Sequence, residues 1–323
     1  MHNSSHNKQL NNKGQYCLGN KVKHCAHFLA VMLLAFGFTA CHSAGDRTSG
    51  DESSDEKART VIEVTAQDYT YRGVPDSIPA GWTTLRMKNK GSETHNLELL
   101  KLPDTVTTQD FRDLNRTYRS LHAKLEAGRI DTAELRKRLP AWSDSIEAIG
   151  GLGHLSPGRN AALTLDLRPG TYGMYCFLKN QKETSHLVLG MTSPLKVTTD
   201  STGASRPEPS NEMRIAGYEI EAEDTLSAGR KTIAVHFGEV SNPEESPFHD
   251  LELARLPEGT SVDTVAAWAS EYTAPAPTNF LGGVIPMPAG ETGYLTVDLN
   301  PGRYAWVSDA SIEKGMMKTF IVE

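Results

Sequence analysis

Short stretches in which apolar and polar residues alternate recur along the chain. In residues 61–66 every second position is apolar (Ile, Val, Ala), and in residues 163–167 three leucines alternate with Thr164 and Asp166. A Pro-Gly turn follows the second stretch and leads into a third at residues 171–177. A period of two residues is typical of β-strands, and several short strands separated by turns are typical of a Greek-key sandwich. The pattern therefore predicts an all-β fold.

The chain also repeats itself. Residues 94–104 (THNLELLKLPD) resemble residues 248–258 (FHDLELARLPE), and residues 150–172 match residues 282–304 without a gap. A repeat unit of more than 100 residues indicates duplicated domains rather than a solenoid. We therefore expect two tandem Greek-key β-sandwich domains, joined by the polar, proline-containing segment 200–212.

One segment of the first repeat has the period of a helix instead. Between residues 108 and 127, apolar side chains recur every three or four positions: Phe111, Leu114, Tyr118, Leu121 and Leu125. A shorter helix is expected after Asp131, because Glu134 follows it at the spacing typical of a helix N-terminus. The corresponding segment of the second repeat, around residues 261–272, is shorter. We expect the helical insertion to lie over one edge or end of the first sandwich.

The first 40 residues differ in character from the rest. They contain four lysines and no acidic residue, and the apolar run 28–38 leads to Thr39, Ala40 and then Cys41. Such a run suits the core of a secretion signal and is short for a transmembrane helix. Small residues before a cysteine resemble the lipobox of bacterial lipoproteins, which implies acylation of Cys41 and a membrane anchor. The alternatives are an ordinary signal peptide or an uncleaved anchor.

The expected organisation is a lipoprotein signal peptide (1–40), an acidic flexible tether (41–59), a first domain (60–199), a linker (200–212) and a second domain (213–323). The lipobox resemblance implies a bacterial cell envelope protein, lipid-anchored and facing the periplasm or the cell exterior. Without residues 1–40, 29 basic residues remain against 40 acidic ones, a net charge of −11. Such a surface repels phosphate, so we expect no nucleic acid among the partners.

Four residues of the first repeat have the chemistry of a metal site: His95, Cys176, His186 and Met191. Cys176 is the only cysteine beyond Cys41, so a disulfide within the folded region is excluded. Two imidazoles and a thiolate, with a weak axial thioether, are the ligands of a mononuclear blue-copper centre. The spacing brings one histidine early in the repeat and the other three residues together near its end.

The sequence around these residues resembles that of cupredoxins. NKGSETHN (89–96) is similar to the strand that carries the first histidine ligand, and PGTYGMYC (169–176), His186 and Gly190-Met191 are similar to the ligand loop. Nine residues separate Cys176 from His186, an interval closer to that of copper nitrite reductases than to that of plastocyanin-like proteins. The resemblance implies one type 1 copper in the first domain, with His186 nearest the surface. Phe177 follows Cys176, whereas many blue-copper proteins have a small hydroxyl residue at this position.

A metal-free interpretation stays open, because each of the four residues could serve packing alone. In the second repeat His249 and Met316 stand at the positions of His95 and Met191, but Ser308 replaces the cysteine and no histidine follows. We expect no copper in that repeat. His154, in a glycine-rich stretch, is expected either on the surface or near the copper site.

Electron transfer by an exported copper protein, with a protein redox partner, is therefore the leading functional hypothesis. The alternative is a copper-free structural or ligand-binding lipoprotein that presents its loops to a partner. A copper enzyme is a third hypothesis and is disfavoured, because no His-x-His pair is present to build a second, catalytic copper centre.

Overall fold

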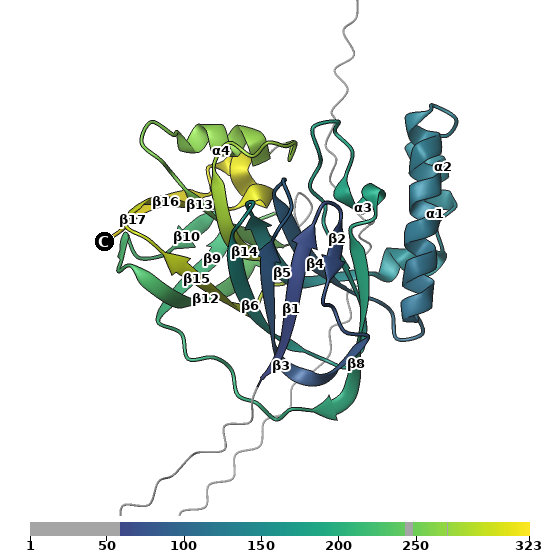
Figure 1. The fold of residues 1–323 in the computed structure, drawn as a ribbon, viewed down its shortest axis with the longest axis horizontal. Helices are drawn as coiled ribbons and strands as arrows, with labels where there is room; N and C mark the ends of the chain where they lie inside the picture. Colours follow the sequence, from purple (N-terminus) through teal and green to yellow (C-terminus); the bar gives the residue numbers. More distant parts are fainter. Residues whose placement is uncertain (1–58, 243–247, 270) are drawn as a thin grey trace, which may run out of the picture. The chain divides into compact units, whose positions relative to one another are not determined.

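The computed structural model describes residues 59–242, 248–269 and 271–323, which belong to one compact unit (Figure 1). Residues 1–58 lie outside the described part, and with them the expected signal peptide, nearly all of the tether and Cys41. Strands make up most of the regular structure, so the all-β prediction is confirmed. Within the described ranges, no helix is long and apolar enough to cross a membrane.

The first repeat forms two packed sheets. Its strands are β1 (Thr60–Gln67), β2 (Thr70–Arg72), β3 (Ser77–Asn89), β4 (His95–Lys101), β5 (Glu147–Leu155), β6 (Asn160–Leu167), β7 (Gly170–Tyr175) and β8 (Thr192–Ser201). One sheet has the order β2-β1-β3-β6, with β1 and β3 parallel. The other has the order β5-β4-β7-β8, and the beginning of β3 pairs with β8. Their apolar faces form the core, as the alternating pattern predicts.

The second repeat follows the same plan. Its strands are β9 (Asn211–Gly217), β10 (Glu219–Glu221), β11 (Thr225–Leu226), β12 (Gly229–Val240), β13 (His249–Arg255), β14 (Asn279–Met287), β15 (Thr292–Leu299), β16 (Gly302–Val307) and β17 (Met317–Val322). The strand orders are β10-β9-β12-β15 and β14-β13-β16-β17-β11. Strands β13 to β16 lie in or overlap the repeated stretches of sequence, so the same strand plan recurs there.

The two repeats share their sheets. Strand β6 pairs antiparallel with β15, where Leu163 lies opposite Leu295, and β5 pairs antiparallel with β14, where Leu155 lies opposite Leu281. Both sheets therefore continue from one repeat into the other. As a result, residues on β5 meet residues of β13 and β14 that lie far away in the sequence.

The helices lie in the insertions. Helix α1 (Thr108–Glu126) occupies the predicted segment, and Thr107 caps it: its hydroxyl accepts a hydrogen bond from the Asp110 N–H. Helix α2 (Thr132–Lys137) starts after Asp131, as predicted. Helix α1 packs against β7 and β8 at the side of the sandwich (Figure 1). The remaining helical segments are η1 (Ala141–Ser145), α3 (His186–Leu189), α4 (Val262–Ala269) and η2 (Asp309–Lys314).

Candidate metal centre

The end of one strand and the start of another bring His95 and Cys176 together. His95 opens β4, and Cys176 follows directly after β7. The two strands pair antiparallel with Glu98 opposite Tyr175, so the first residues of β4 lie beside the last residues of β7. The N–H of Asn96 points at the Cys176 sulphur, 3.5 Å away. Two residues that are 81 positions apart in sequence are thereby fixed by backbone pairing.

The loop after Cys176 folds back toward the end of β7 and places His186 and Met191 close to Cys176. The N–H of His186 donates a hydrogen bond to the Leu178 carbonyl (2.8 Å), which starts α3 beside the end of β7. The N–H of Met191 donates to the His186 carbonyl (2.8 Å), and its own carbonyl accepts from the Cys176 N–H (3.2 Å). Gly190 allows this tight return, because its φ of 112° is in a region that favours glycine. Met191 is fully buried there.

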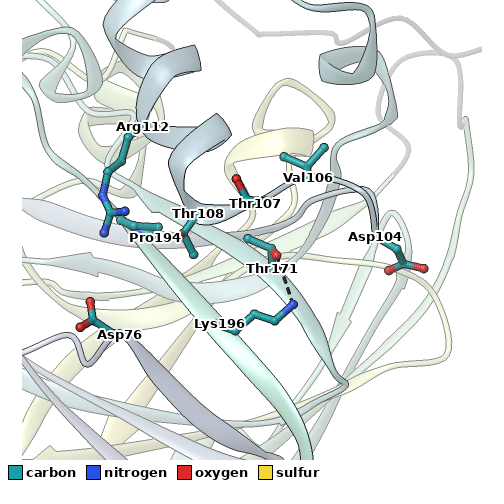
Figure 2. Close-up of a pocket in the computed structure, with 9 residues that line it drawn as sticks. All are labelled: Asp76, Asp104, Val106, Thr107, Thr108, Arg112, Thr171, Pro194 and Lys196. Carbon is teal, nitrogen blue, oxygen red and sulfur yellow. Dashed lines mark hydrogen bonds between the residues drawn. The ribbon is translucent and has the colours of Figure 1, made fainter.

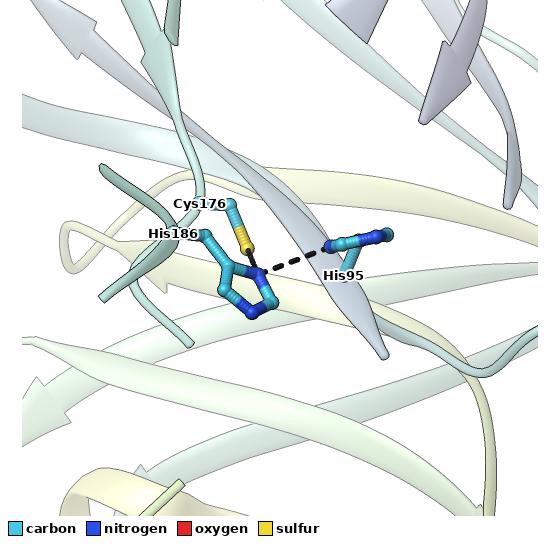
Figure 3. Close-up of side chains that lie close together, drawn as sticks. All are labelled: His95, Cys176 and His186. Carbon is cyan, nitrogen blue, oxygen red and sulfur yellow. Dashed lines mark hydrogen bonds between the residues drawn. The ribbon is translucent and has the colours of Figure 1, made fainter. Parts of the chain in front are cut away.

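The side chains of His95, Cys176 and His186 converge on one point (Figure 3). The Nδ1 atoms of the two histidines are 3.1 Å apart, and the Cys176 sulphur is 3.3 Å from the His186 Nδ1. All three side chains have no solvent exposure. The structure thus brings together the three residues that the sequence singled out as equatorial ligands, and it places Met191 on the same loop.

Two carboxylates hold the outer nitrogens of the histidines. The Nε2 of His95 is 2.6 Å from the Asp68 carboxylate, and the Nε2 of His186 is 2.9 Å from that of Glu93. Ser92 anchors Asp68 through its N–H (2.8 Å) and its hydroxyl (2.6 Å). A carboxylate on one ring nitrogen fixes the proton there and leaves the other nitrogen free to accept a metal. Both Nδ1 atoms therefore present their lone pairs to the centre.

The sequence analysis missed both carboxylates. Glu93 lies in the stretch 89–96, two residues before His95. Nothing in the sequence indicates that its carboxylate would contact His186 rather than His95. Asp68 lies in the turn after β1, outside any motif. Gly91 is a further sign: a Cβ there would lie 2.2 Å from the Asp68 carboxylate and 2.7 Å from the His95 Nε2, so only glycine fits.

The protonation states match what a metal requires of imidazoles. Burial, together with the neighbouring His95, lowers the pKa of His186 to about 3, and burial also lowers the pKa of His95. Both rings are therefore neutral at pH 7. Burial raises the pKa of the Cys176 thiol to about 12, so a metal ion must displace its proton on binding.

The spacing of these atoms fits a single ion. A metal about 2.0–2.1 Å from nitrogen and about 2.3 Å from sulphur, the distances known for zinc, sets neighbouring ligand atoms roughly 3–4 Å apart. The observed spacings of 3.1 and 3.3 Å fall in this range. A thiolate with two imidazoles and a buried thioether on the same loop favours copper among the first-row metals.

The region around the sulphur is buried and cross-linked by hydrogen bonds of Asn96. The Asn96 side-chain oxygen accepts a hydrogen bond from the Phe177 N–H (3.3 Å), and the Tyr71 hydroxyl donates to the Asn96 carbonyl. Asn96 thus connects both segments that carry His95 and Cys176. Hydrogen bonds and apolar surroundings at the sulphur tune the potential of such a site.

His186 is as buried as the other three residues of the centre: Tyr69 lies over it with ring centroids 4.6 Å apart, Glu93 covers its outer nitrogen, and its exposure is 0 %. The expectation for His154 is wrong. His154 is neither a surface residue nor part of this centre. It is fully buried, and its ring nitrogens face Glu252 and Asp309 of the second repeat.

The corresponding residues of the second repeat are engaged in other ways. Ser308, at the position of Cys176, donates a hydrogen bond to the Asp250 carboxylate (2.8 Å). The Nε2 of His249, at the position of His95, is 3.3 Å from the Glu239 carbonyl. At these positions of the second repeat, Ser308 and His249 therefore form hydrogen bonds within the protein.

A pocket of about 330 Å³ lies near the start of α1 (Figure 2). It is lined by Asp76, Asp104, Val106, Thr107, Thr108, Arg112, Thr171, Pro194 and Lys196. Figure 2 shows Lys196 directed at Thr171, with 3.5 Å between the ammonium and the hydroxyl. The pocket shares no residue with the metal centre.

No protein-family model matches the chain, and no curated protein matches it. Solved structures similar to it include a reduced auracyanin from Roseiflexus castenholzii, 23% identical, which covers 44% of this chain and 98% of its own with a TM-score of 0.27. Auracyanin A from Chloroflexus aurantiacus, described as a "blue" copper protein, is 20% identical and covers 44% of this chain and 100% of its own with a TM-score of 0.26. A multicopper oxidase is 14% identical and covers 81% of this chain and 88% of its own with a TM-score of 0.23. Two of these structures are auracyanins and the third is a multicopper oxidase. The candidate ligands are identified from the geometry of this chain's own residues.

Proposed function

We propose that the protein binds one copper ion through His95, Cys176 and His186, with Met191 as the axial ligand, and functions in electron transfer. The observation that carries this proposal is the convergence of two neutral imidazole nitrogens and one thiol sulphur at 3.1 and 3.3 Å in a buried site. Copper in such a set supplies one-electron chemistry between its two oxidation states.

The protein's own part is to hold the ligands and exclude water. Asp68 and Glu93 keep a proton on the outer nitrogen of each imidazole, so the rings cannot turn away from the centre. The Asn96 N–H supports the sulphur when it carries negative charge. A ligand set that is already in place needs little rearrangement when the charge of the ion changes, and small rearrangement favours rapid electron transfer.

We further propose that acylated Cys41 anchors the protein in the bacterial cell envelope, where it faces the periplasm or the exterior and exchanges electrons with a partner protein. The support is the apolar run 28–38 followed by Thr39, Ala40 and Cys41. Mass spectrometry of the N-terminal peptide tests this directly. A diacylated or triacylated Cys41 is expected, and an intact peptide through residues 39–41 contradicts the anchor.

Copper uptake by matched variants tests the site. Cys176→Ser removes the thiolate and is expected to lose the tightly bound copper, while circular dichroism shows an unchanged fold. The control is Ser308→Cys, which puts a thiol at the corresponding position of the second repeat, which has His249 but no second histidine. It is expected to add no copper site of this kind. Equal copper uptake by wild type and Cys176→Ser contradicts the proposal and leaves a metal-free binding protein.

A further inference from the structure

A second group of potential metal ligands lies between the two repeats. It consists of His154 on β5, Glu252 on β13 and Asp309 at the start of η2, with one ligand atom of each within 4.8 Å of the others. The His154 Nε2 is 2.9 Å from an Asp309 oxygen, and its Nδ1 is 3.3 Å from a Glu252 oxygen. The three side chains are 0–1 % exposed.

Each member of this group has an unsatisfied buried atom. These atoms are the His154 Nδ1, the Glu252 Oε1 and the Asp309 Oδ1. The other Glu252 oxygen accepts a hydrogen bond from the His154 N–H (2.7 Å), which fixes the carboxylate in place. The Tyr272 side chain hydrogen-bonds the Asp309 carboxylate, whereas the His154 Nδ1 and the Glu252 Oε1 lie 3.3 Å apart without a hydrogen bond between them. Buried polar atoms without hydrogen bonds are costly, so a further partner at these two atoms is indicated.

The charge of the group points to a cation. Across the described residues, Glu252 and Asp309 make their ion pairs with His154 alone. A neutral imidazole has one N–H and cannot donate to both carboxylates, which together carry two negative charges when ionised. Burial and the negative charge of Asp309 raise the pKa of Glu252 well above its ordinary value, so without a cation this carboxyl keeps its proton. A divalent cation would displace that proton and balance the charges of both carboxylates.

The surroundings of His154 are aromatic, and two glycines leave room for the Glu252 carboxylate. The His154 ring lies 5.3–5.7 Å, between centroids, from four aromatic rings: Phe177, Trp268, Tyr272 and Phe280. A Cβ at Gly153 would lie 2.3 Å from the Glu252 Oε2, and one at Gly283 would lie 2.6 Å from the same atom. Two neighbouring glycines, one from each repeat, therefore accommodate Glu252.

We propose that His154, Glu252 and Asp309 form a second metal site, for a divalent cation with the ligand preference of zinc. One imidazole and two carboxylates are donors that zinc accepts, and a fourth position is left for water or another oxygen. Because His154 belongs to the first repeat and the two carboxylates to the second, the ion joins the repeats. The site contains no thiolate, which separates it chemically from the copper centre.

Zinc binding by the full chain tests this proposal. All proteins carry Cys176→Ser, which removes the thiolate of the copper centre and makes the outcome independent of the proposed function. Equilibrium dialysis against zinc chloride with elemental analysis is expected to show a single tight equivalent. Adding Glu252→Gln, which keeps the size of the side chain, is expected to weaken zinc binding at least about 100-fold, since even outer partners of metal ligands contribute 10–100-fold.

The matched control is Glu98→Gln. Glu98 holds the position of Glu252 in the first repeat and is also a buried carboxylate on a central strand. This variant is expected to keep the zinc equivalent and the rise in melting temperature that zinc causes, whereas Glu252→Gln loses both although it folds without metal. Unchanged zinc binding in Glu252→Gln, or no tight zinc in the Cys176→Ser protein, overturns the proposal and leaves a proton-bridged cluster of the histidine and the two carboxylates.

Discussion

Glu98 makes the stability of the metal-free protein depend on pH near neutrality. It lies on β4 with 6 % of its surface exposed. Burial, opposed by a hydrogen bond with Tyr175 and reinforced by the negative charge of Asp250, raises the pKa of Glu98 to about 7 from its ordinary 4.5. The perturbation is Glu98→Gln, which keeps the shape of the side chain and removes its charge.

The magnitude follows from the two pKa values. In the unfolded chain Glu98 loses its proton near pH 4.5, but in the folded protein it keeps the proton up to about pH 7. Between these values the folded state binds more protons, so the free energy of unfolding falls as the pH rises and levels off above pH 7. At about 1.4 kcal/mol per pH unit, the full loss is about 3 kcal/mol. The glutamine side chain of the variant cannot titrate, so the variant escapes this loss.

Urea unfolding with a metal chelator, at pH 5 and at pH 8, measures the effect. Because the unfolded chain has already lost most of this proton at pH 5, the difference in free energy of unfolding between Glu98→Gln and wild type is expected to move by about 2.5 kcal/mol in favour of the variant from pH 5 to pH 8. Glu219→Gln, at an exposed position on the edge strand β10, is the control and is expected to show no such change. A difference that stays constant over this pH range refutes the reasoning.

Four further substitutions test the surroundings of the centre and the insertion. Asp68→Asn and Glu93→Gln are expected to lower copper affinity by about 10–100-fold, measured by competition with a chelator, because each loosens one imidazole; unchanged affinity would contradict that role. Gly91→Ala is expected to lower copper affinity to a similar extent, since its Cβ would displace the Asp68 carboxylate, and an unperturbed titration would show that the turn can adjust. Thr107→Ala is expected to lower the free energy of unfolding by about 1 kcal/mol in urea melts, because it removes the cap of α1, and no loss would mean that packing alone sets the helix end.

Local patterns predicted the elements of this fold well. The strand around Leu163 and helix α1 follow from periods of two and 3.6 residues, which are visible in a few consecutive positions. The convergence of His95, Cys176 and His186 was implied by the resemblance to cupredoxins, and in the structure the antiparallel pairing of β4 with β7 brings His95 and Cys176 together.

Contacts between distant segments could not be predicted in this way. His154 is 98 residues from Glu252 and 155 from Asp309, and they meet only because β5 of one repeat pairs with β14 of the other. Strand β4 is buried on both faces over His95–Leu99, including Glu98, although the alternating sequence indicates one polar face. Asp68 reaches His95 from a turn whose position depends on the whole first sheet.

The most direct test of the copper site is the spectrum of the wild-type protein, freed of metal and given one equivalent of Cu(II). An intense blue band from thiolate-to-copper charge transfer, with narrow hyperfine splitting in the electron paramagnetic resonance spectrum, is expected from His95, Cys176, His186 and Met191. A colourless protein that is folded, with Cys176 still reduced, would contradict the copper site and the electron-transfer function built on it.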